Sequence, residues 1–352
     1  AKSREQKYKS NGYETHKIDM FKETSKTMNY LIADGYRILA SNFPSVYGLI
    51  YDVFDHSSFN NKFLKNALVI LKKSLLKEIK EIKPDVIIGT HPFAVGLVSS
   101  YKRKNEIDCS FISVVTDFKA HYAYVDEQVD AYITGSEYTK RSLIQRNIRE
   151  DKIFTYGIPI NEEFSKDYSE TSNKRIKFRV LVMGGSMGSK DIAKVVKKLA
   201  VNSNSYLITV VCGNNKSLKT NLEKKYEDEI IMGRLNVLGF TDKVPYLMDN
   251  SDVIVTKPGG LTTTEALSKR IPMIIPFAIP GQEMENTEFL VREGVAFHLE
   301  DMDEINIVLD RLVNDDIEFK IMKKKMGQIS SSYSLDRIVD LSETLVARSL
   351  SL

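Results

Sequence analysis

Two successive series of short apolar segments, each alternating with longer amphipathic segments, constrain the fold of this chain most strongly. Near-continuous apolar strands separated by helices are typical of parallel sheets that are covered on both faces. We therefore expect an α/β fold with two doubly wound, Rossmann-like domains facing a cleft. The predicted strands are 14–18, 86–89, 111–115, 131–134, 153–156, 178–183, 206–211, 236–239, 252–255 and 273–275. The main predicted helices are 62–82, 136–146, 190–200, 216–227, 244–250, 262–269, 282–293 and 335–350.

The length of 352 residues also favours two domains, because one compact core rarely grows so large. We expect an N-terminal domain over 1–160, a polar linker over 161–177 and a C-terminal domain over 178–334. We expect the last segment, 335–352, to form a helix that packs back on the first domain. Residues 1–11 are polar and helical in pattern, whereas an α/β domain normally begins with a strand. We therefore expect a native first strand and the loop after it to be missing from this sequence.

The composition and charge favour a globular protein that lies in a reducing compartment and has no membrane-spanning segment. A formal net charge of +3 gives no global support for nucleic-acid binding. Cys109 and Cys212 lie in apolar runs, which favours buried thiols in a reducing cytoplasm over a disulfide. We see no signal peptide and no run of 18 residues apolar enough to span a bilayer.

The segment 257–267, Lys-Pro-Gly-Gly-Leu-Thr-Thr-Thr-Glu-Ala-Leu, follows a predicted strand and opens a predicted helix. Gly259 and Gly260 lack Cβ atoms, so a ligand can approach the backbone closely. The first helical turn, which includes Thr262, presents unpaired N–H groups and the positive end of the helix dipole, and such a site attracts a diphosphate. Glu265 follows where a carboxylate can accept hydrogen bonds from ribose hydroxyls. The alternative is an ordinary strand–turn–helix junction with a Thr cap.

Three other loops at predicted strand ends carry unusual residues. A glycine-rich loop at 183–189 is suited to phosphate, although it matches neither the dinucleotide-binding nor the P-loop pattern. An aromatic residue after a glycine at 238–241 can stack on a base or belong to the core. A polar helix start at 280–286 suits a ligand with many hydroxyls, or is a capped and solvated helix end. The candidate residues in these loops are Gly184, Ser186, Gly239, Phe240, Gly281, Gln282, Glu283 and Asn286.

Taken in order, the motifs resemble those of the monogalactosyldiacylglycerol synthase family and its bacterial relatives, the processive diacylglycerol glucosyltransferases. More distantly, they resemble the N-acetylglucosaminyltransferase that makes lipid II. The resemblance implies a GT-B fold and inverting transfer of glucose or galactose from a UDP-sugar to diacylglycerol. The UDP-sugar is then a co-substrate, and neither a metal nor another cofactor is required. The motifs lie at 46–52, 90–92, 115–118 with His121, 156–160, 184–188, 256–267 and 280–286.

The resemblance also implies roles for the candidate residues. Gly259, Gly260 and the first helical turn would hold the diphosphate, and Glu265 would bind ribose. The loop at Gly239 and Phe240 would meet uracil. The side chains that would bind the sugar hydroxyls are those of Gln282, Glu283 and Asn286.

This sequence differs from the family pattern in its catalytic residues. Members of the family begin with a strand and a glycine-rich loop that ends in a His, and this sequence has no such segment. Asp117 and His121 are the remaining candidates for a base or its support, although an Asp at a strand end can simply cap a turn. We expect His91, before Pro92, to be structural or to line the acceptor site. All His residues are His16, His56, His91, His121 and His298.

The aromatic and lysine-rich stretch 36–83 is not explained by nucleotide chemistry. Phe43 and Tyr47 precede a pattern in which Lys62, Lys65, Lys72 and Lys73 alternate with apolar residues. Such a stretch can lie in an anionic membrane interface, or it can be a core-facing helix with a solvated lysine face. On the residues alone the second alternative is favoured, whereas the resemblance to a lipid-acceptor family favours the membrane.

The expected partners are therefore a UDP-sugar, diacylglycerol and anionic membrane lipids, with no nucleic acid. We expect the protein to be cytoplasmic and peripherally associated with the inner face of the membrane. Two alternatives stay open. One is transfer to another membrane lipid, such as a lipid II precursor, and the other is a nucleotide-sugar-binding protein without catalysis.

Overall fold

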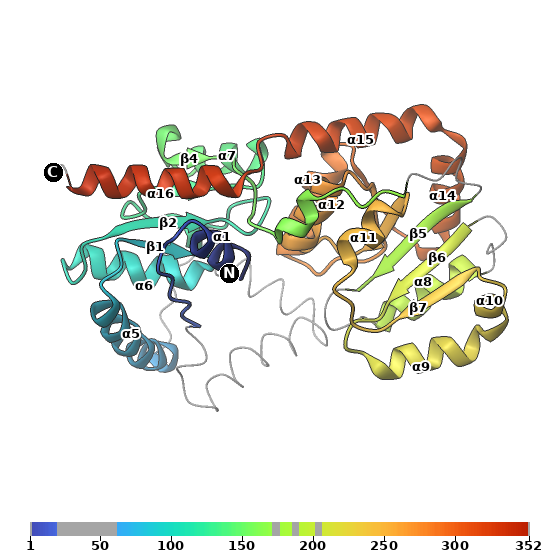
Figure 1. Ribbon diagram of the computed structural model, residues 1–352, viewed down its shortest axis with the longest axis horizontal. Helices are drawn as coiled ribbons and strands as arrows, with labels where there is room; N and C mark the ends of the chain where they lie inside the picture. Colours follow the sequence, from blue (N-terminus) through green and yellow to red (C-terminus); the bar gives the residue numbers. More distant parts are fainter. Residues whose placement is uncertain (1, 20–61, 171–176, 185–189, 201–205, 351–352) are drawn as a thin grey trace. The chain divides into compact units, whose positions relative to one another are not determined.

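The computed structural model describes residues 2–19, 62–170, 177–184, 190–200 and 206–350. The chain forms two compact units. Unit 1 comprises Ala1–Pro159, Ile279–Gln282 and Ser332–Leu352, and unit 2 comprises Ile160–Ala278 and Glu283–Ser331. Each unit contains one fully parallel sheet with helices around it (Figure 1). The prediction of two doubly wound α/β domains is confirmed.

The sheet of unit 2 has the strand order β10-β9-β8-β5-β6-β7. The chain therefore builds β5, β6 and β7 in one direction and then returns to the other side of β5 for β8, β9 and β10. The strand order reverses between β5 and β8, which pair in parallel with Met183 opposite Thr256. The strands are β5 (Phe178–Met183), β6 (Tyr206–Val211), β7 (Leu235–Leu238), β8 (Val253–Thr256), β9 (Met273–Ile275) and β10 (Ala296–His298).

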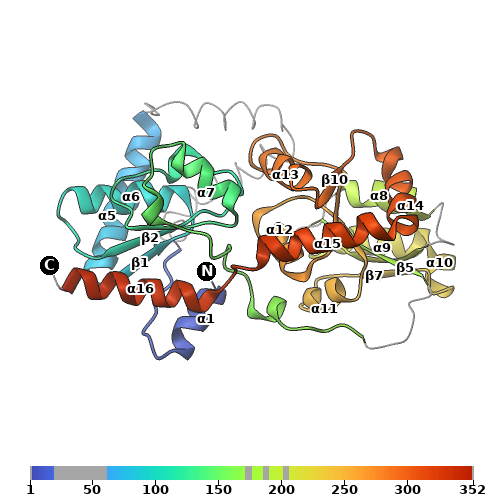
Figure 2. The same cartoon turned by 90° about the horizontal axis from the view of Figure 1, so that it is seen from above.

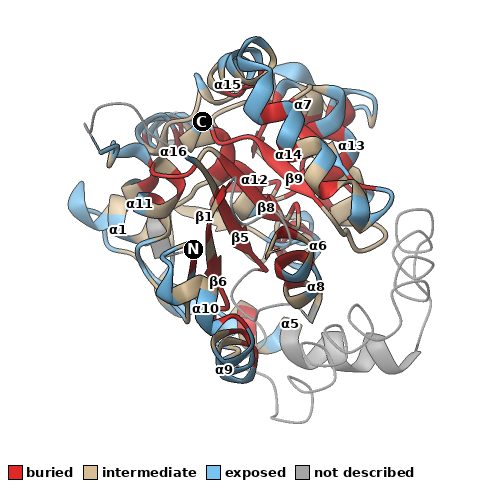
Figure 3. Ribbon diagram, turned by 90° about the vertical axis from the view of Figure 1, so that its right-hand side faces the viewer, coloured by how far each residue is buried: buried red, intermediate tan, exposed pale blue. Residues whose placement is uncertain are grey.

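Helices cover both faces of this sheet. Val180 and Val182 of β5 belong to a buried cluster with residues of α8, α9, α14 and α15. Leu181, the alternate residue of β5, points to the opposite face and is equally buried. Both faces of the sheet are therefore covered, as the burial colours of β5 indicate (Figure 3). Each buried aliphatic side chain contributes about 1.5–3 kcal/mol to stability. The helices are α8 (Lys190–Ala200), α9 (Lys216–Lys225), α10 (Glu227–Ile231), α11 (Val244–Asp249), α12 (Gly260–Lys269), α13 (Gln282–Arg292), α14 (Ile305–Asn314) and α15 (Asp316–Ser330).

The sheet of unit 1 has the sequential order β1-β2-β3-β4. Val95 of α6 and Leu143 of α7 pack in the cluster on one face, and Ile338 and Leu341 of α16 pack on the other (Figure 2). The strands are β1 (Val86–Gly89), β2 (Ser110–Val114), β3 (Ala131–Ile133) and β4 (Ile153–Phe154). The helices are α1 (Lys2–Ser10), α5 (Lys62–Ile82), α6 (Pro92–Arg103), α7 (Glu137–Ile144) and α16 (Leu335–Leu350).

The return of the chain to unit 1 before α16 is held by specific contacts. The hydroxyl of Tyr333 donates to the carbonyl of Gly135 at 2.6 Å, and Ser334 N donates to Tyr156 O at 2.9 Å. Gly157 has φ +85°, and a Cβ there would lie 2.5 Å from the ring of Tyr333. Only glycine therefore fits this position, both for its backbone conformation and for the ring against it.

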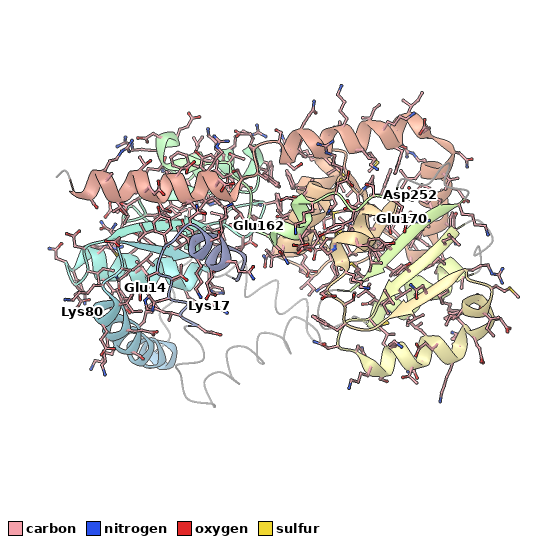
Figure 4. The ribbon with its side chains drawn as sticks, viewed as in Figure 1. Glu14, Lys17, Lys80, Glu162, Glu170 and Asp252 are labelled. Atoms are coloured by element: carbon pink, nitrogen blue, oxygen red, sulfur yellow. The ribbon has the colours of Figure 1, made fainter. Side chains whose placement is uncertain are left out.

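The polar segment after Pro159 packs on unit 2 where the structure describes it. Tyr168 N donates to Asp249 Oδ2 at 2.9 Å, and Glu170 N donates to Asn250 Oδ1 at 3.0 Å. Glu170 and Asp252, labelled in Figure 4, both contact Arg179 at the start of β5. The described segment 162–170 is therefore bonded to the surface of unit 2 and belongs to that unit.

One predicted strand is wrong, and several elements were not predicted. Residues 14–18 are irregular: Glu14 and His16 are exposed, so the segment offers no apolar face to a sheet. Strand β10 and helices α10, α14 and α15 were missed. Cys109 and Cys212 are buried free thiols, as predicted. Within the described residues, no helix is long and apolar enough to span a bilayer.

Candidate functional site

The most distinctive site lies at the carboxyl ends of β5 and β8, where the strand order of unit 2 reverses. Gly184 and Lys257 directly follow the paired residues Met183 and Thr256, so the two predicted loops emerge side by side. In open parallel sheets, ligands bind outside the carboxyl ends of the strands at such a reversal. The structure therefore brings together two of the loops that were predicted separately. Ser186, in the first loop, lies outside the described residues.

The turn after β8 leaves the start of α12 without a side-chain cap. Its N-cap is Gly259, and no side chain accepts a hydrogen bond there. The first bond into the helix runs from Thr263 N to Gly259 O at 2.8 Å. The N–H groups of Gly260 to Thr262 precede that bond and lie at the positive end of the helix dipole. A Cβ on Gly259 would meet no atom within 4 Å, which shows that space is open beside the turn.

Two polar side chains of α12 have no partner among the described residues. Glu265 forms neither a hydrogen bond nor an ion pair with any described residue, and burial raises its pKa to about 7. The hydroxyl of Thr263 is fully buried and has no described hydrogen-bond partner. Buried polar groups nearly always form hydrogen bonds. A helix with two buried polar side chains that lack a described hydrogen-bond partner, beside an open turn, is therefore a candidate ligand site.

The start of α13 joins the same site. Lys257 Nζ lies 2.9 Å from Glu283 Oε1, and Asn286 Nδ2 donates to Pro258 O at 2.8 Å. Asn286 is fully buried, so its amide supports the turn from behind. Gly281, with φ +90°, adopts the left-handed conformation that glycine favours just before α13.

The aromatic loop after β7 lies further along the same sheet edge. Phe240 is 70% exposed, which excludes a core position for its ring. A Cβ on Gly239 would meet its nearest atom, in the side chain of Lys219, at 3.6 Å. Strand β6 separates β7 from β5, so this loop stands apart from the Gly184 loop by one strand.

The candidate residues of unit 1 lie at the carboxyl ends of β1 and β2. Gly89 pairs with Ser113, so His91 and Asp117 follow neighbouring strands. Both candidate histidines form turns through their side chains. His91 Nδ1 accepts from Phe93 N at 3.2 Å and caps α6, and His121 Nδ1 accepts from Ala123 N at 3.0 Å. These bonds hold each Nδ1 as an acceptor, so a neutral ring carries its proton on Nε2.

Asp117 is buried, and its surroundings are polar. Gln282, which belongs to the same compact unit, donates its side-chain amide to Asp117 Oδ1. The hydroxyls of Thr116 and Tyr124 lie 2.9 Å apart, and burial together with the Asp117 charge raises the pKa of Tyr124. The structure thus places the candidate base in contact with a residue that was predicted to bind the sugar.

The lysine-rich helix α5 shows a core-facing side in its described half. Leu75 and Ile79 are buried against Tyr101, whose hydroxyl donates to Lys72 O at 2.6 Å. The ammonium of Lys72 lies 5.7 Å from the centre of the Tyr101 ring, and Lys73 is exposed. Phe43, Tyr47 and the side chains of Lys62 and Lys65 lie outside the described residues.

Lys257 was not assigned a role from the sequence. The signal for it is a lysine placed directly between a buried apolar strand and a Pro-Gly-Gly turn. Thr263 was also missed, because a Thr in a helix has no distinctive pattern. Across the described parts of the chain, no three His, Cys, Asp or Glu side chains gather as a metal site would require.

Comparison with known proteins covers both units. Residues 1–160 match the model of the monogalactosyldiacylglycerol (MGDG) synthase family, and residues 179–336 match that of the glycosyltransferase family 28 C-terminal domain. The processive diacylglycerol beta-glucosyltransferase of Bacillus subtilis (strain 168) is 29% identical over 340 residues, which cover 92% of this chain and 85% of the relative. The enzyme of the same name from Bacillus pumilus (strain SAFR-032) is 29% identical over 350 residues, covering 94% and 87%.

Solved structures confirm the fold. The crystal structure of Acinetobacter baumannii MurG superposes with a TM-score of 0.59 at 15% identity, covering 80% of this chain and 79% of that one. At this identity the likeness concerns the fold alone. The predicted GT-B fold and the predicted resemblance are both confirmed.

Proposed function

We propose that this chain, which belongs to the monogalactosyldiacylglycerol synthase family and carries a glycosyltransferase family 28 C-terminal domain, transfers a hexose from a UDP-sugar to diacylglycerol. One observation carries the proposal: the uncapped start of α12 lies at the reversal of strand order, and the carboxyl of Glu265 on the same helix has no partner among the described residues. A nucleoside diphosphate supplies the anion for the helix start and the ribose hydroxyls for the carboxyl. The names of the relatives favour glucose as the hexose.

On the donor side, the N–H groups of Gly260 to Thr262 bind the diphosphate. Glu265 accepts hydrogen bonds from ribose, and the exposed ring of Phe240 stacks on uracil. Glu283 and Gln282 bind sugar hydroxyls, and Asn286 holds the turn. When the bond between the anomeric carbon and the diphosphate breaks, negative charge grows on UDP, and the helix dipole stabilises it without a metal.

On the acceptor side, Asp117 acts as general base. It removes the proton from the diacylglycerol hydroxyl as that oxygen attacks the anomeric carbon from the side opposite UDP, so the configuration inverts. The amide of Gln282 orients the carboxylate of Asp117. His121 supports the loop through its bond to Ala123 N.

Diacylglycerol is held in a bilayer, so the protein must meet a membrane surface to reach it. We infer that the stretch with Phe43, Tyr47, Lys62, Lys65, Lys72 and Lys73 makes this contact with anionic lipids. The protein would then be a peripheral protein of the cytoplasmic face of the membrane, where UDP-sugars are available.

The test is a transfer assay. The purified protein is incubated with vesicles of anionic phospholipid and diacylglycerol, and separately with radiolabelled UDP-glucose and UDP-galactose. We expect a labelled glycolipid that depends on diacylglycerol and is lost in Glu265→Ala. The control variant is Asp108→Asn, an exposed residue in a loop of unit 1. Failure of both donors to label any lipid, with UDP still bound in calorimetry, would leave a nucleotide-sugar-binding protein and refute the transfer.

A further inference from the structure

We propose that Lys257 is a shared cation that pairs with Glu283 in the free protein and passes to the diphosphate when a UDP-sugar binds, which releases the Glu283 carboxylate for the sugar. The inference rests on the proposed function and deepens it. It concerns how the site distinguishes the donor, which carries a sugar, from the product UDP, which does not.

Lys257 and Glu283 form a partly buried ion pair. Lys257 Nζ and Glu283 Oε1 are 2.9 Å apart, and their side chains are 29% and 14% exposed. Both belong to unit 2. Two bonds brace the turn that carries Lys257: Gly259 N donates to Lys257 O at 3.0 Å, and the side-chain amide of Asn286 in α13 donates to Pro258 O at 2.8 Å. A partly buried pair on a braced backbone is stronger than a surface pair, because it is less screened by water.

A diphosphate at the start of α12 competes with Glu283 for the ammonium of Lys257. Lys257 stands between the end of β8 and the uncapped start of α12. A lysine is a point charge on a flexible stem, so its ammonium can turn from one anion to another without a change of backbone. A diphosphate at the helix start carries about two negative charges against the single charge of Glu283, and it therefore competes well for Lys257.

The departure of Lys257 makes the carboxylate of Glu283 available to the sugar. Once the ammonium is drawn to the diphosphate, the partly buried carboxylate loses a charged partner that had offset its desolvation. Hydroxyls of a hexose on the diphosphate can donate to it in replacement. UDP has no hexose and supplies none of these donors when it binds alone. The pair thus weakens binding of the product relative to the donor, which favours product release.

The exchange predicts opposite effects of one substitution on two ligands. Glu283→Gln removes the competitor for Lys257, so UDP affinity should rise, by roughly three- to tenfold. The freed ammonium also favours UDP-glucose, but the loss of a charged acceptor for the sugar is the larger effect, so the KM for UDP-glucose should still rise, by about tenfold. Lys257→Met should weaken both ligands, and Lys257→Arg should restore much of the UDP affinity. A role of the pair in stability alone would not change UDP and UDP-glucose in opposite directions.

The experiment measures UDP binding by calorimetry and UDP-glucose kinetics for the wild type, Glu283→Gln, Lys257→Met, Lys257→Arg and the double variant Lys257→Met with Glu283→Gln. Lys224→Met, an exposed lysine of α9, is the matched control, and thermal melting checks the fold of each variant. In the double variant the gain in UDP affinity from Glu283→Gln should vanish. Unchanged or weaker UDP binding by Glu283→Gln, in a protein that still transfers sugar, overturns the exchange alone. A wild type that binds no UDP overturns the proposed function with it.

Discussion

The two α/β units present their candidate residues in contrasting ways. In unit 2, α12 begins without a cap and Glu265 has no described partner, so the groups that would meet a ligand are left open. In unit 1, a ring nitrogen of His91 and one of His121 each accept a backbone hydrogen bond within a turn, and buried Asp117 accepts a hydrogen bond from Gln282. The site of unit 2 is therefore built by backbone geometry before any ligand arrives. In unit 1, the reactive groups also hold the loops together, so chemistry and stability must be tested separately there.

The largest effect should come from Asp117→Asn. A general base typically contributes a factor of about 10²–10⁴ to the rate, so turnover should fall by that much. UDP affinity should stay within about twofold, because the groups proposed to bind UDP itself lie at the start of α12, at Glu265 and at Phe240. Calorimetry measures the affinity and the transfer assay measures the rate. Asp108→Asn, exposed in the same unit, controls for the loss of a carboxylate. If Asp117→Asn turns over at the wild-type rate, unit 1 supplies its base from another residue.

The next effect concerns the membrane. Replacing Lys62, Lys65, Lys72 and Lys73 by Gln should reduce binding to anionic vesicles, since each lysine near such a surface contributes about 1 kcal/mol. Lys72 should contribute least, because its ammonium lies over the ring of Tyr101. Vesicle sedimentation at low and high salt measures the change. The matched control removes the exposed lysines Lys197, Lys216, Lys224 and Lys225 of unit 2. Equal losses in both variants would show that only net charge matters.

A smaller effect should follow from Glu265→Gln. Loss of the charged acceptor for ribose should weaken UDP-glucose binding by about 1–3 kcal/mol. The ionised carboxylate is the better acceptor, and its pKa is about 7 in the free protein. Wild-type affinity should therefore rise between pH 6 and pH 8 and level off above, roughly one unit either side of that pKa. UDP-glucose is the right probe because its esterified diphosphate does not titrate in this range. A flat profile for the wild type would remove Glu265 from the ribose site.

The same residue should alter stability in the opposite direction. Its pKa is raised in the folded protein from 4.5 to about 7, so the folded state binds a proton that the unfolded state lacks between those values. Proton binding by Glu265 therefore raises the free energy of unfolding at low pH, and this contribution is lost as pH rises through 7. Without ligand, Glu265→Gln should therefore melt at a higher temperature than the wild type at pH 8, and the gap should narrow toward pH 5. Equal melting temperatures at pH 8 would show that the carboxyl is better solvated than its burial indicates.

Much of this molecule was predictable because its signals are local. Strand Phe178–Met183 and helix Leu335–Leu350 begin and end where the apolar pattern does. The turn at Gly259 was recognisable because strand, turn and helix start are contiguous. Strand β10 was missed because only three residues, Ala296–His298, pair with β9, and pairing rather than pattern makes so short a segment extended. The contact of Lys257 with Glu283 and the bond from Asn286 to Pro258 join separate segments, which a sequence pattern does not reveal.

The return of α16 to unit 1 has a consequence for how the protein is made. The residues of unit 2 precede α16 along the chain and leave the ribosome first, and domains fold as units during synthesis. One face of the unit 1 sheet is covered by Ile338 and Leu341, so that face stays unprotected until the whole of unit 2 has been translated. The unit that is synthesised first is therefore the unit that is completed last. A nascent chain paused within unit 2 lacks Ile338 and Leu341, so Ile112 and Ile133, which share their buried cluster, are left less covered.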